Sequence, residues 1–391
     1  MRIAIDVNGV TETSGLGNYI KLLVSNLAAL DHKNEYLLYQ HQWRPHSHKD
    51  LEGILPRQSN FKLLSHRLPN LISLYSEYTL GIPLVELFLR NYGIDVYHGP
   101  SNIVPRFKTI KSVVTIHHYT SVADRLFQQD PRHFRENLYF DFTEKAAQSA
   151  THIITVSEHT KRSLIQELSV SSQKISVVYP GGPLPACKKI EHPVLPPALA
   201  AKLSGKFILF CGPLNARKNL PVLLEAFSSI KEKLSAHKIA ITTHPSSSYR
   251  QAISSLAEKL SLSSRLVFLG DVSNQEMALL YNKAECLVYS SLSEGFGSPP
   301  LEAMACGCPV LCSNVTAIPE VVGDAAFLVS PTDKEALAAA LLKITTDPVL
   351  RRDLVAKGLK RVKKFSWPGM TKDTLELYKN IADLSENRGA E

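Results

Sequence analysis

The chain has 391 residues, enough for two or three domains, because a single hydrophobic core rarely serves more than about 250–300 residues. Hydrophobic residues make up 44% and charged residues 20% of the chain, a composition that excludes a disordered or fibrous protein. The formal charge of +8 favours anionic ligands or anionic membrane surfaces. The charge is not gathered into a basic arm and no zinc-finger pattern accompanies it, so we do not expect nucleic acid as a partner.

The sequence predicts neither a membrane-spanning helix nor a signal peptide. No apolar run approaches the roughly 20 residues that a bilayer requires, and the opening MRIAIDVNGV is typical of a strand. The six cysteines form no CxxC pair, and we expect them to be buried and reduced, as in a cytoplasmic protein.

Thirteen short apolar runs predict strands. They are rich in β-branched residues and continuously apolar, as strands buried on both faces of a parallel sheet should be. The first seven are Arg2–Val7, Tyr36–Gln40, Phe61–Ser65, Asp95–His98, Ser112–His117, His152–Val156 and Lys174–Tyr179. The other six are Phe207–Cys211, Lys238–Thr242, Leu266–Leu269, Cys286–Tyr289, Pro309–Cys312 and Ala326–Val329.

Segments with helical periodicity alternate with these strands, for example over 17–30, 134–149, 220–233 and 274–283. This alternation predicts an α/β fold with two doubly wound, Rossmann-like sheets. Each sheet should bind its ligand beyond the carboxyl ends of its strands, so we expect a cleft between two facing domains.

Two interruptions predict where the domains separate. The sequence PGGP over 180–183 opens a proline-rich stretch, so we place a linker near 181–204. Near the other end, Pro368 should bend or restart the chain before a helix over about 370–384.

The segment EGFGSPPLEAMACGCPV over 294–310 should follow a strand and open a helix, within whose first turn we place Glu302. Gly295 and Gly297 allow the backbone to approach a ligand, and the helix start can bind an anion. Glu294 and Glu302 are suited to vicinal sugar hydroxyls. The alternative is that Glu302 only complements the helix dipole while Glu294 is solvated.

The segment CGPLNARKN over 211–219 also lies between a strand and a helix. Gly212 permits the turn, and Arg217 and Lys218 offer a planar fork and a point charge that suit a diphosphate. Taken alone, two adjacent basic residues more often form a solvated surface. No Walker GxxxxGK[ST] string is present.

Two signals belong to the first half of the chain. Gly15 and Gly17 open a helix in a glycine-containing loop that can approach a ligand or simply form a tight turn. His117 ends a strand where an α/β fold places ligand groups, so it can bind substrate hydroxyls or transfer a proton. The alternative is an ordinary, partly buried imidazole.

Together these motifs resemble those of the retaining glycosyltransferases of family four, the group 1 glycosyltransferases with the GT-B fold. The resemblance spans nearly the whole chain. The motifs occur in the order GLGNY at 15–19, TIHH at 115–118, ITVSEHTK at 154–161, VYPG at 178–181, CGPLNARKN at 211–219, FLGDVS at 268–273, EGFGSPPLEAMACG at 294–307 and PEVVGDAA at 319–326.

The resemblance implies an N-terminal acceptor domain over 1–182 and a nucleotide-sugar donor domain over 183–368. It also implies that a C-terminal helix at about 369–388 crosses back to the N-terminal domain. The expected activity is that of a hexosyltransferase with no cofactor, acting on a nucleotide-sugar donor and a glycan or lipid-linked acceptor.

The resemblance also assigns roles to residues. Arg217 and Lys218 would hold the donor diphosphate, and Glu302 would bind the ribose hydroxyls. Glu294 would hold the donor sugar, and His117 would lie against that sugar near the reacting carbon. The backbone of Phe296, Gly297 and Ser298 would hold the donor sugar and its phosphate together with Glu294. The remaining donor-binding positions would be Gly15, Gly17, Gly212 and Leu301. Many relatives have His-Asp where this chain has His117-His118.

The mechanism expected from this resemblance is metal-independent and retaining. No Asp-x-Asp triplet occurs in the chain, so we expect Arg217, Lys218 and a helix start to stabilise the departing diphosphate. We expect mannose from GDP-mannose as the donor, in polysaccharide synthesis, with transfer of glucose, N-acetylglucosamine or galactose from a UDP-sugar as the alternative. A nucleotide-sugar epimerase, a PLP-dependent phosphorylase, a silent sugar-nucleotide-binding subunit and a nicotinamide dehydrogenase are further alternatives.

The acceptor side is least family-like over 41–93, a segment that contains Trp43, Tyr75, Tyr78, Phe88 and Tyr92 among basic residues. An amphipathic surface here would let the protein contact an anionic membrane peripherally, at its inner face, and reach a lipid-linked acceptor. The alternative is an ordinary helical flank of the N-terminal domain.

Overall fold

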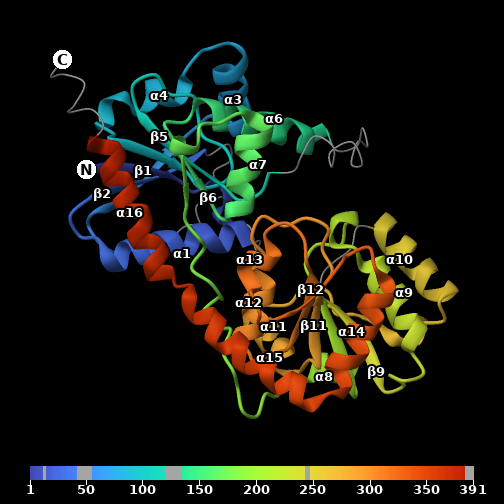
Figure 1. Ribbon diagram of the computed structural model, residues 1–391. Helices are drawn as coiled ribbons and strands as arrows, with labels where there is room; N and C mark the ends of the chain where they lie inside the picture. The colour runs from blue at the N-terminus through green and yellow to red at the C-terminus, as the bar shows by residue number, and fades with distance from the viewer. Residues whose placement is uncertain (12–14, 42–54, 120–133, 243–246, 384–391) are drawn as a thin grey trace. The chain divides into compact units, whose positions relative to one another are not determined.

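The structure is a computed structural model that describes residues 1–11, 15–41, 55–119, 134–242 and 247–383 (Figure 1). The chain divides into two compact units. Unit 1 consists of residues 1–181 together with 366–391, and unit 2 consists of residues 182–365. Each unit is built around one parallel sheet.

Unit 1 contains a seven-stranded sheet in the order β3-β2-β1-β4-β5-β6-β7, and every neighbouring pair is parallel. Its strands are β1 (Arg2–Asp6), β2 (Glu35–His41), β3 (Phe61–His66), β4 (Val96–Gly99), β5 (Lys111–Ile116), β6 (His152–Thr155) and β7 (Ile175–Val177). Its helices are α1 (Gly15–Leu30), α3 (Asn70–Thr79), α4 (Leu84–Leu89), α6 (Phe134–Ser149), α7 (Glu158–Leu168) and α16 (Trp367–Asp383).

Unit 2 contains a six-stranded parallel sheet in the order β10-β9-β8-β11-β12-β13. Its strands are β8 (Lys206–Cys211), β9 (His237–Thr242), β10 (Leu266–Phe268), β11 (Cys286–Tyr289), β12 (Val310–Ser313) and β13 (Phe327–Val329). Its helices are α8 (Pro197–Lys202), α9 (Leu220–Ile230), α10 (Ser247–Lys259), α11 (Asn274–Lys283), α12 (Ser298–Ala305), α13 (Ile318–Val322), α14 (Lys334–Thr346) and α15 (Pro348–Arg361).

The two doubly wound sheets predicted from the apolar runs are confirmed, and each of the thirteen strands falls within a residue or two of its predicted bounds. The middle residues of the central strands are buried because helices cover both faces of each sheet, whereas those of the outer strands β3, β7, β10 and β13 are partly exposed. When the strands of each unit are numbered in chain order, both sheets have the strand order 3-2-1-4-5-6, followed in unit 1 by a seventh strand. The direction of this order therefore reverses between the first and fourth strands. Ligands bind at such a reversal in open α/β sheets.

The last helix completes the core of unit 1. Met370, Tyr378 and Ile381 of α16 are buried in the same cluster as Ile3 of β1 and Leu23 of α1. In Figure 1, α16 runs beside α1. The Tyr378 hydroxyl also lies 2.5 Å from Nδ1 of the buried His98. Pro368 is the second residue of α16, where a proline suits the start of a helix.

The predicted linker near 181–204 is wrong in one respect, because it contains a helix. Helix α8 begins at Pro197, which fits the first helical position since its missing N–H has no helical partner there. Within the described residues, no helix combines the length and apolar character needed to cross a membrane.

Gly181 has no room for a side chain. A Cβ atom there would lie 2.3 Å from the Trp367 Cα atom, which is backbone and cannot move aside cheaply. We therefore expect Gly181→Ala to lower the melting temperature by roughly 5–10 °C in a thermal unfolding experiment. Gly9→Ala is the control, because its Cβ would meet only the flexible end of Ile20 at 3.2 Å. Equal melting temperatures for the two variants would contradict the packing described for Gly181.

Candidate active site in unit 2

The candidate site lies where the strand order of unit 2 reverses, between β8 and β11. The segment 212–219 leaves the carboxyl end of β8, and the segment 290–297 leaves that of β11. Because β8 and β11 are paired neighbours, the two segments that the sequence singled out emerge side by side. This is the position at which an open α/β sheet binds a ligand.

The segment after β8 has a specific backbone course. Gly212 has a φ of 106°, and a Cβ there would come within 3.1 Å of the Lys218 Cε atom. The side chain of Asn215 then accepts a hydrogen bond from the Lys218 backbone N–H at 3.3 Å and caps a short 3-10 helix over Ala216–Lys218. Glycine is therefore required at 212 both for the turn and for the space that Lys218 occupies.

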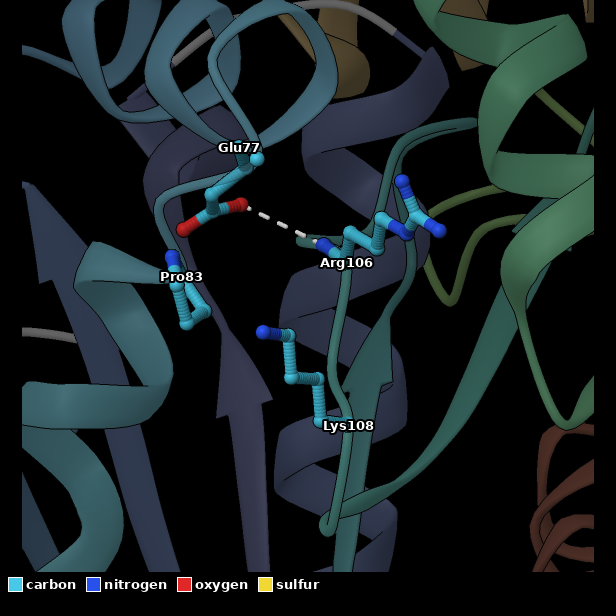
Figure 2. Close-up of a pocket in the computed structure, with 5 residues that line it drawn as sticks. Glu77, Pro83, Arg106 and Lys108 are labelled. Carbon is cyan, nitrogen blue, oxygen red and sulfur yellow. Dashed lines mark hydrogen bonds between the residues drawn. The ribbon is translucent and has the colours of Figure 1, made fainter.

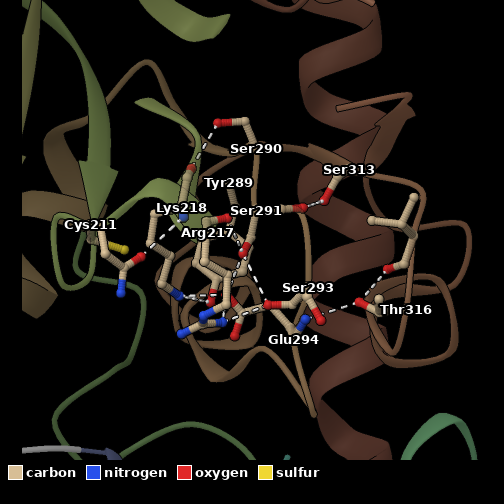
Figure 3. A network of polar contacts seen from close by, with 12 residues as sticks. Cys211, Arg217, Lys218, Tyr289, Ser290, Ser291, Ser293, Glu294, Ser313 and Thr316 are labelled. Carbon is tan, nitrogen blue, oxygen red and sulfur yellow. Dashed lines mark hydrogen bonds and ion pairs between the residues drawn. The ribbon is translucent and has the colours of Figure 1, made fainter. Parts of the chain in front are cut away.

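Lys218, Arg217 and Glu294 form one buried ion cluster (Figure 3). Glu294 Oε1 lies 2.5 Å from Lys218 Nζ and 2.8 Å from an Arg217 guanidinium nitrogen. Lys218 also donates to the Tyr289 hydroxyl at 2.7 Å, and its Nζ lies 4.5 Å from the centre of the Tyr289 ring. Ser291 donates a further hydrogen bond to Glu294 at 2.6 Å.

Burial and charge oppose each other in this cluster. Burial alone would raise the pKa of Glu294, but Lys218, Arg217 and the hydrogen bonds to its carboxylate lower that pKa to about 2. Burial lowers the pKa of Lys218, and the Glu294 carboxylate opposes this shift. With Glu294 ionised, the three side chains carry one net positive charge in a low-dielectric environment, which favours an anionic ligand.

Serine hydroxyls join the two segments of the site (Figure 3). Ser290 donates to the Asn219 carbonyl at 3.1 Å, and the Ser291 hydroxyl oxygen, whose proton is donated to Glu294, lies 3.2 Å from the Arg217 carbonyl. The Leu292 N–H donates to the same Arg217 carbonyl at 2.8 Å. Sequence analysis missed Ser290, Ser291 and Tyr289, although a polar pair directly after a buried strand was a signal for such a role.

Glu302 also lies near the carboxyl end of β8, to which Tyr281 connects it. The Tyr281 hydroxyl donates to Glu302 at 3.1 Å and lies 3.6 Å from the Cys211 sulfur. Burial raises the pKa of Glu302 to about 7. Burial also raises the pKa of the Cys211 thiol to about 12, and Lys218, Glu302 and Glu294 all act on it electrostatically. Lys218 and both acids therefore lie near the carboxyl end of β8.

The start of α12 differs from our expectation in two ways. The helix begins at Ser298, so Glu302 lies in the second turn and not in the first. Pro299 and Pro300 have no N–H, so the first turn has fewer donors for an anion than an ordinary helix. Gly297, with a φ of 94°, precedes the helix in a left-handed conformation that glycine adopts without strain.

The apolar positions expected to bind the donor are mostly inaccessible. The Leu301 side chain is 0% exposed and packs in the core, so a ligand cannot contact it in this conformation. Phe296 is also buried, with its ring edge-on to that of Phe365 and the two ring centres 5.7 Å apart.

All six cysteines are free and buried, as the sequence predicted. Among the described residues, no group of three or more His, Cys, Asp or Glu is arranged to hold a metal ion.

His117, Gly15 and Gly17 belong to unit 1, whereas Arg217, Lys218 and Glu294 belong to unit 2. His117 follows β5, and its Nε2 lies 2.8 Å from the Pro100 carbonyl, to which it can only donate. Burial lowers the pKa of His117 to about 4, so the ring is neutral at pH 7 and presents Nδ1 as an acceptor. Gly15 is the exposed first residue of α1, and Gly17 is buried within it.

Two family models match the chain. A model described as Glycosyltransferase Family 4 matches residues 13–183, and one described as Glycosyl transferases group 1 matches residues 194–361. Between them they span most of both units. The chain is a group 1 glycosyltransferase.

Individual relatives agree with this family. The glycosyltransferase is 29% identical to O-antigen chain mannosyltransferase B of Escherichia coli over 94% of this chain and 96% of that protein. Sucrose-phosphate synthase from Thermosynechococcus elongatus has a TM-score of 0.78 at 20% identity, with 98% and 100% of the two chains covered. Anabaena Alr3699/HepE in complex with UDP-glucose has a TM-score of 0.71 at 15% identity, with 97% and 100% covered. These structures confirm the predicted GT-B fold.

The raised pKa of Glu302 predicts how stability depends on pH. The folded protein keeps the Glu302 proton up to about pH 7, whereas the unfolded chain releases it near 4.5, so this group lowers stability as the pH rises between these values. Glu302→Gln removes that cost and keeps an acceptor for Tyr281. We expect this variant to be more stable than the parent at pH 8, by up to about 3 kcal/mol, with the difference shrinking towards pH 5.

Thermal melting at the two pH values measures this difference. Glu258→Gln on the exposed side of α10 is the control, and its effect should be small at both. A Glu302→Gln variant that is equally or less stable than the parent at pH 8 would contradict the raised pKa.

Proposed function

We propose that this glycosyltransferase transfers mannose from GDP-mannose to a glycan or lipid-linked acceptor in cell-surface polysaccharide synthesis. The observation that carries the proposal is the buried cluster of Arg217, Lys218 and Glu294 at the switch point of unit 2, with its net positive charge. The choice of mannose is supported by the similarity to a relative named as an O-antigen chain mannosyltransferase. A UDP-sugar is the second candidate donor, favoured by a structural neighbour in complex with UDP-glucose.

The proposed reaction breaks the bond between the anomeric carbon and the diphosphate oxygen. Arg217 and Lys218 stabilise the negative charge that develops on the departing nucleoside diphosphate. Because Glu294 already neutralises one of these two cations, the diphosphate has to compete with Glu294 for them. Its arrival frees the carboxylate to accept hydrogen bonds from sugar hydroxyls, the role expected of Glu294. Glu302 accepts hydrogen bonds from the ribose hydroxyls.

We further propose that the anomeric configuration is retained. The acceptor oxygen forms its bond on the face that the diphosphate leaves, and the departing phosphate oxygen takes the acceptor proton, so no protein nucleophile takes part. A neutral His117 fits this scheme as a hydrogen-bonding group beside the sugar, since with a pKa of about 4 it lacks the second ring proton that a general acid would supply at pH 7.

We propose a cytoplasmic location, at the inner face of the membrane where a lipid-linked acceptor would be found. The support is the composition of the chain, whose six cysteines are all free and buried. A catalytically silent subunit is the less favoured alternative, because a protein that only binds the sugar nucleotide has no need of a cation cluster placed to stabilise a leaving group.

The test of the donor is a transfer assay with GDP-mannose, UDP-glucose and other nucleotide sugars, read out as nucleoside diphosphate released in the presence of acceptor. We expect release with GDP-mannose, and expect Lys218→Met to lower kcat/KM at least about 100-fold because the charge on the leaving group is then less stabilised. Lys233→Met on the exposed surface of unit 2 is the control and should retain activity.

Two results would count against the proposal. Undiminished transfer by a folded Lys218→Met variant would remove Lys218 from the site. Release with UDP-sugars alone would replace the proposed donor but leave the site intact.

The proposed reaction also predicts how the transfer rate depends on metal ions. Because positively charged side chains take the place of a metal in the proposed reaction, we expect the transfer rate to be unchanged in excess EDTA. The same assay with added Mg²⁺ or Mn²⁺ is the comparison. A strict requirement for either ion would contradict metal-independent transfer.

A further inference from the structure

Helix α3 of unit 1 exposes several apolar side chains on one side and buries polar side chains, together with Leu74, on the other. Leu71, Ile72 and Tyr75 are 53%, 51% and 54% exposed. Ser76 and Glu77, in contrast, are 6% and 1% exposed. A surface helix normally buries its apolar side and exposes its polar side, so this arrangement needs a reason.

The polar side of α3 is held in place by specific hydrogen bonds. The Ser76 hydroxyl lies 3.1 Å from the Ile82 carbonyl. The Glu77 carboxylate accepts one hydrogen bond from the Val85 N–H at 3.0 Å and another from the Arg106 N–H at 3.2 Å (Figure 2). Burial of this carboxyl raises its pKa to about 7. The helix therefore cannot rotate to bury its apolar side without breaking these bonds.

The exposed apolar side chains continue beyond the helix. Leu80 and Ile82, in the loop that joins α3 to α4, are 60% and 44% exposed. We call the set of Leu71, Ile72, Tyr75, Leu80 and Ile82 the α3 face. Of the aromatic residues that sequence analysis placed on such a surface, Tyr75 belongs to it. Tyr78 and Phe88 are partly buried, Tyr92 is exposed beyond α4, and Trp43 lies outside the described residues.

The accessible charge beside the α3 face is positive. Arg106 and Lys108 are exposed and, with the buried Glu77 and with Gly81 and Pro83, line a cavity of about 190 Å³ next to the loop of the α3 face (Figure 2). Over residues 55–94 the acids are Glu77 and Glu86, and both are buried and bound to backbone N–H groups. No acid of that segment is exposed. Outside it, the partly buried Glu144 of α6 lines a second cavity together with Arg106 and Lys145.

Exposed apolar side chains beside exposed cations match the two layers of an anionic bilayer, whose phosphates lie above its acyl chains. A second copy of the same surface would instead bring like charges together. We propose that the α3 face binds the surface of an anionic lipid bilayer, with its apolar side chains among the acyl chains and with Arg106 and Lys108 against the lipid phosphates. This deepens the proposed function, because it identifies the surface that meets a lipid-linked acceptor.

The test is flotation of the full chain with vesicles, in the absence of any sugar nucleotide. We expect co-flotation with vesicles of phosphatidylcholine containing phosphatidylglycerol, weaker binding to phosphatidylcholine alone, and loss of the difference at high salt. Addition of inorganic phosphate at constant ionic strength should not release the protein, which distinguishes a bilayer from a free phosphate as the ligand.

Matched pairs of variants locate the surface. Leu71→Gln with Ile72→Gln should lower vesicle affinity about tenfold or more, whereas Val194→Gln with Val349→Gln should not, although those two valines are 77% and 65% exposed. Arg106→Gln with Lys108→Gln should lower affinity for the anionic vesicles by a similar factor. Removing two exposed charges from unit 2 by Arg352→Gln with Lys360→Gln should have less effect.

Several outcomes would overturn this proposal. Absence of flotation by the parent, or full binding by the Leu71→Gln, Ile72→Gln variant, would exclude the α3 face as a membrane surface. A dimer that light scattering detects in the parent, and that the same variant loses without any effect of vesicles, would assign the face to a second copy.

Activity separates this proposal from the proposed function. All these variants should melt near the parent temperature and keep the parent rate on a soluble acceptor. An inactive parent that still floats with anionic vesicles would contradict the proposed function only.

Discussion

The site of unit 2 depends on the contact between Lys218 and Glu294. A lone ammonium or carboxylate is costly to bury, because each loses its hydration in a low-dielectric interior. Here each charge compensates the other, while Arg217 and Ser291 make further contacts to the Glu294 carboxylate and Tyr289 accepts a hydrogen bond from Lys218. The backbone follows from this requirement. Gly212 leaves space for the Lys218 stem, and the serines after β11 join the segment that holds Glu294 to the one that holds the cations.

Such a contact contributes little to the stability of the fold, and its main effect is to hold the charged side chains of the site in place. Replacing a buried ion pair by apolar residues often leaves stability unchanged, so its presence is weak evidence of a need for stability. A cation that already has a partner can exchange it for a phosphate oxygen without a large change in its own solvation. The same exchange gives the carboxylate a free acceptor. In the proposed reaction, such a preformed pair would couple the binding of a diphosphate to the availability of an acid beside the sugar.

The sequence predicted the sheets well and the contacts of the site only in part. Continuous apolar runs such as those of β11 and β12 could be located because both faces of a parallel strand are buried, which leaves a plain signal in one short segment. The basic pair, Glu294 and Glu302 were identified because each follows a strand. That Glu294 contacts the basic pair could not be predicted, because this contact depends on strand order, and β8 and β11 are neighbours although two strands separate them in the chain.

Helix α8 was missed because the high density of proline residues was interpreted as a linker. The position of Glu302 in the second turn of α12 was missed because the start of that helix depends on Gly297. The burial of Ser76 and Glu77 in α3 could not be predicted, because it depends on hydrogen bonds to backbone groups outside the helix.

The two units differ in whether they are formed from one continuous segment of the chain, and this difference has a consequence for folding during translation. Unit 2 is one continuous segment, whereas unit 1 needs its last helix, α16, whose Met370 and Tyr378 fill the same core as β1 and α1. A ribosome that adds about 5–20 residues per second needs roughly 10–40 seconds to proceed from the end of β7 to the C-terminus. During that time the first sheet is complete but part of its apolar surface is uncovered. Unit 2, although it is translated later, can finish folding first, and nascent unit 1 is the part of the protein that most needs protection by a chaperone.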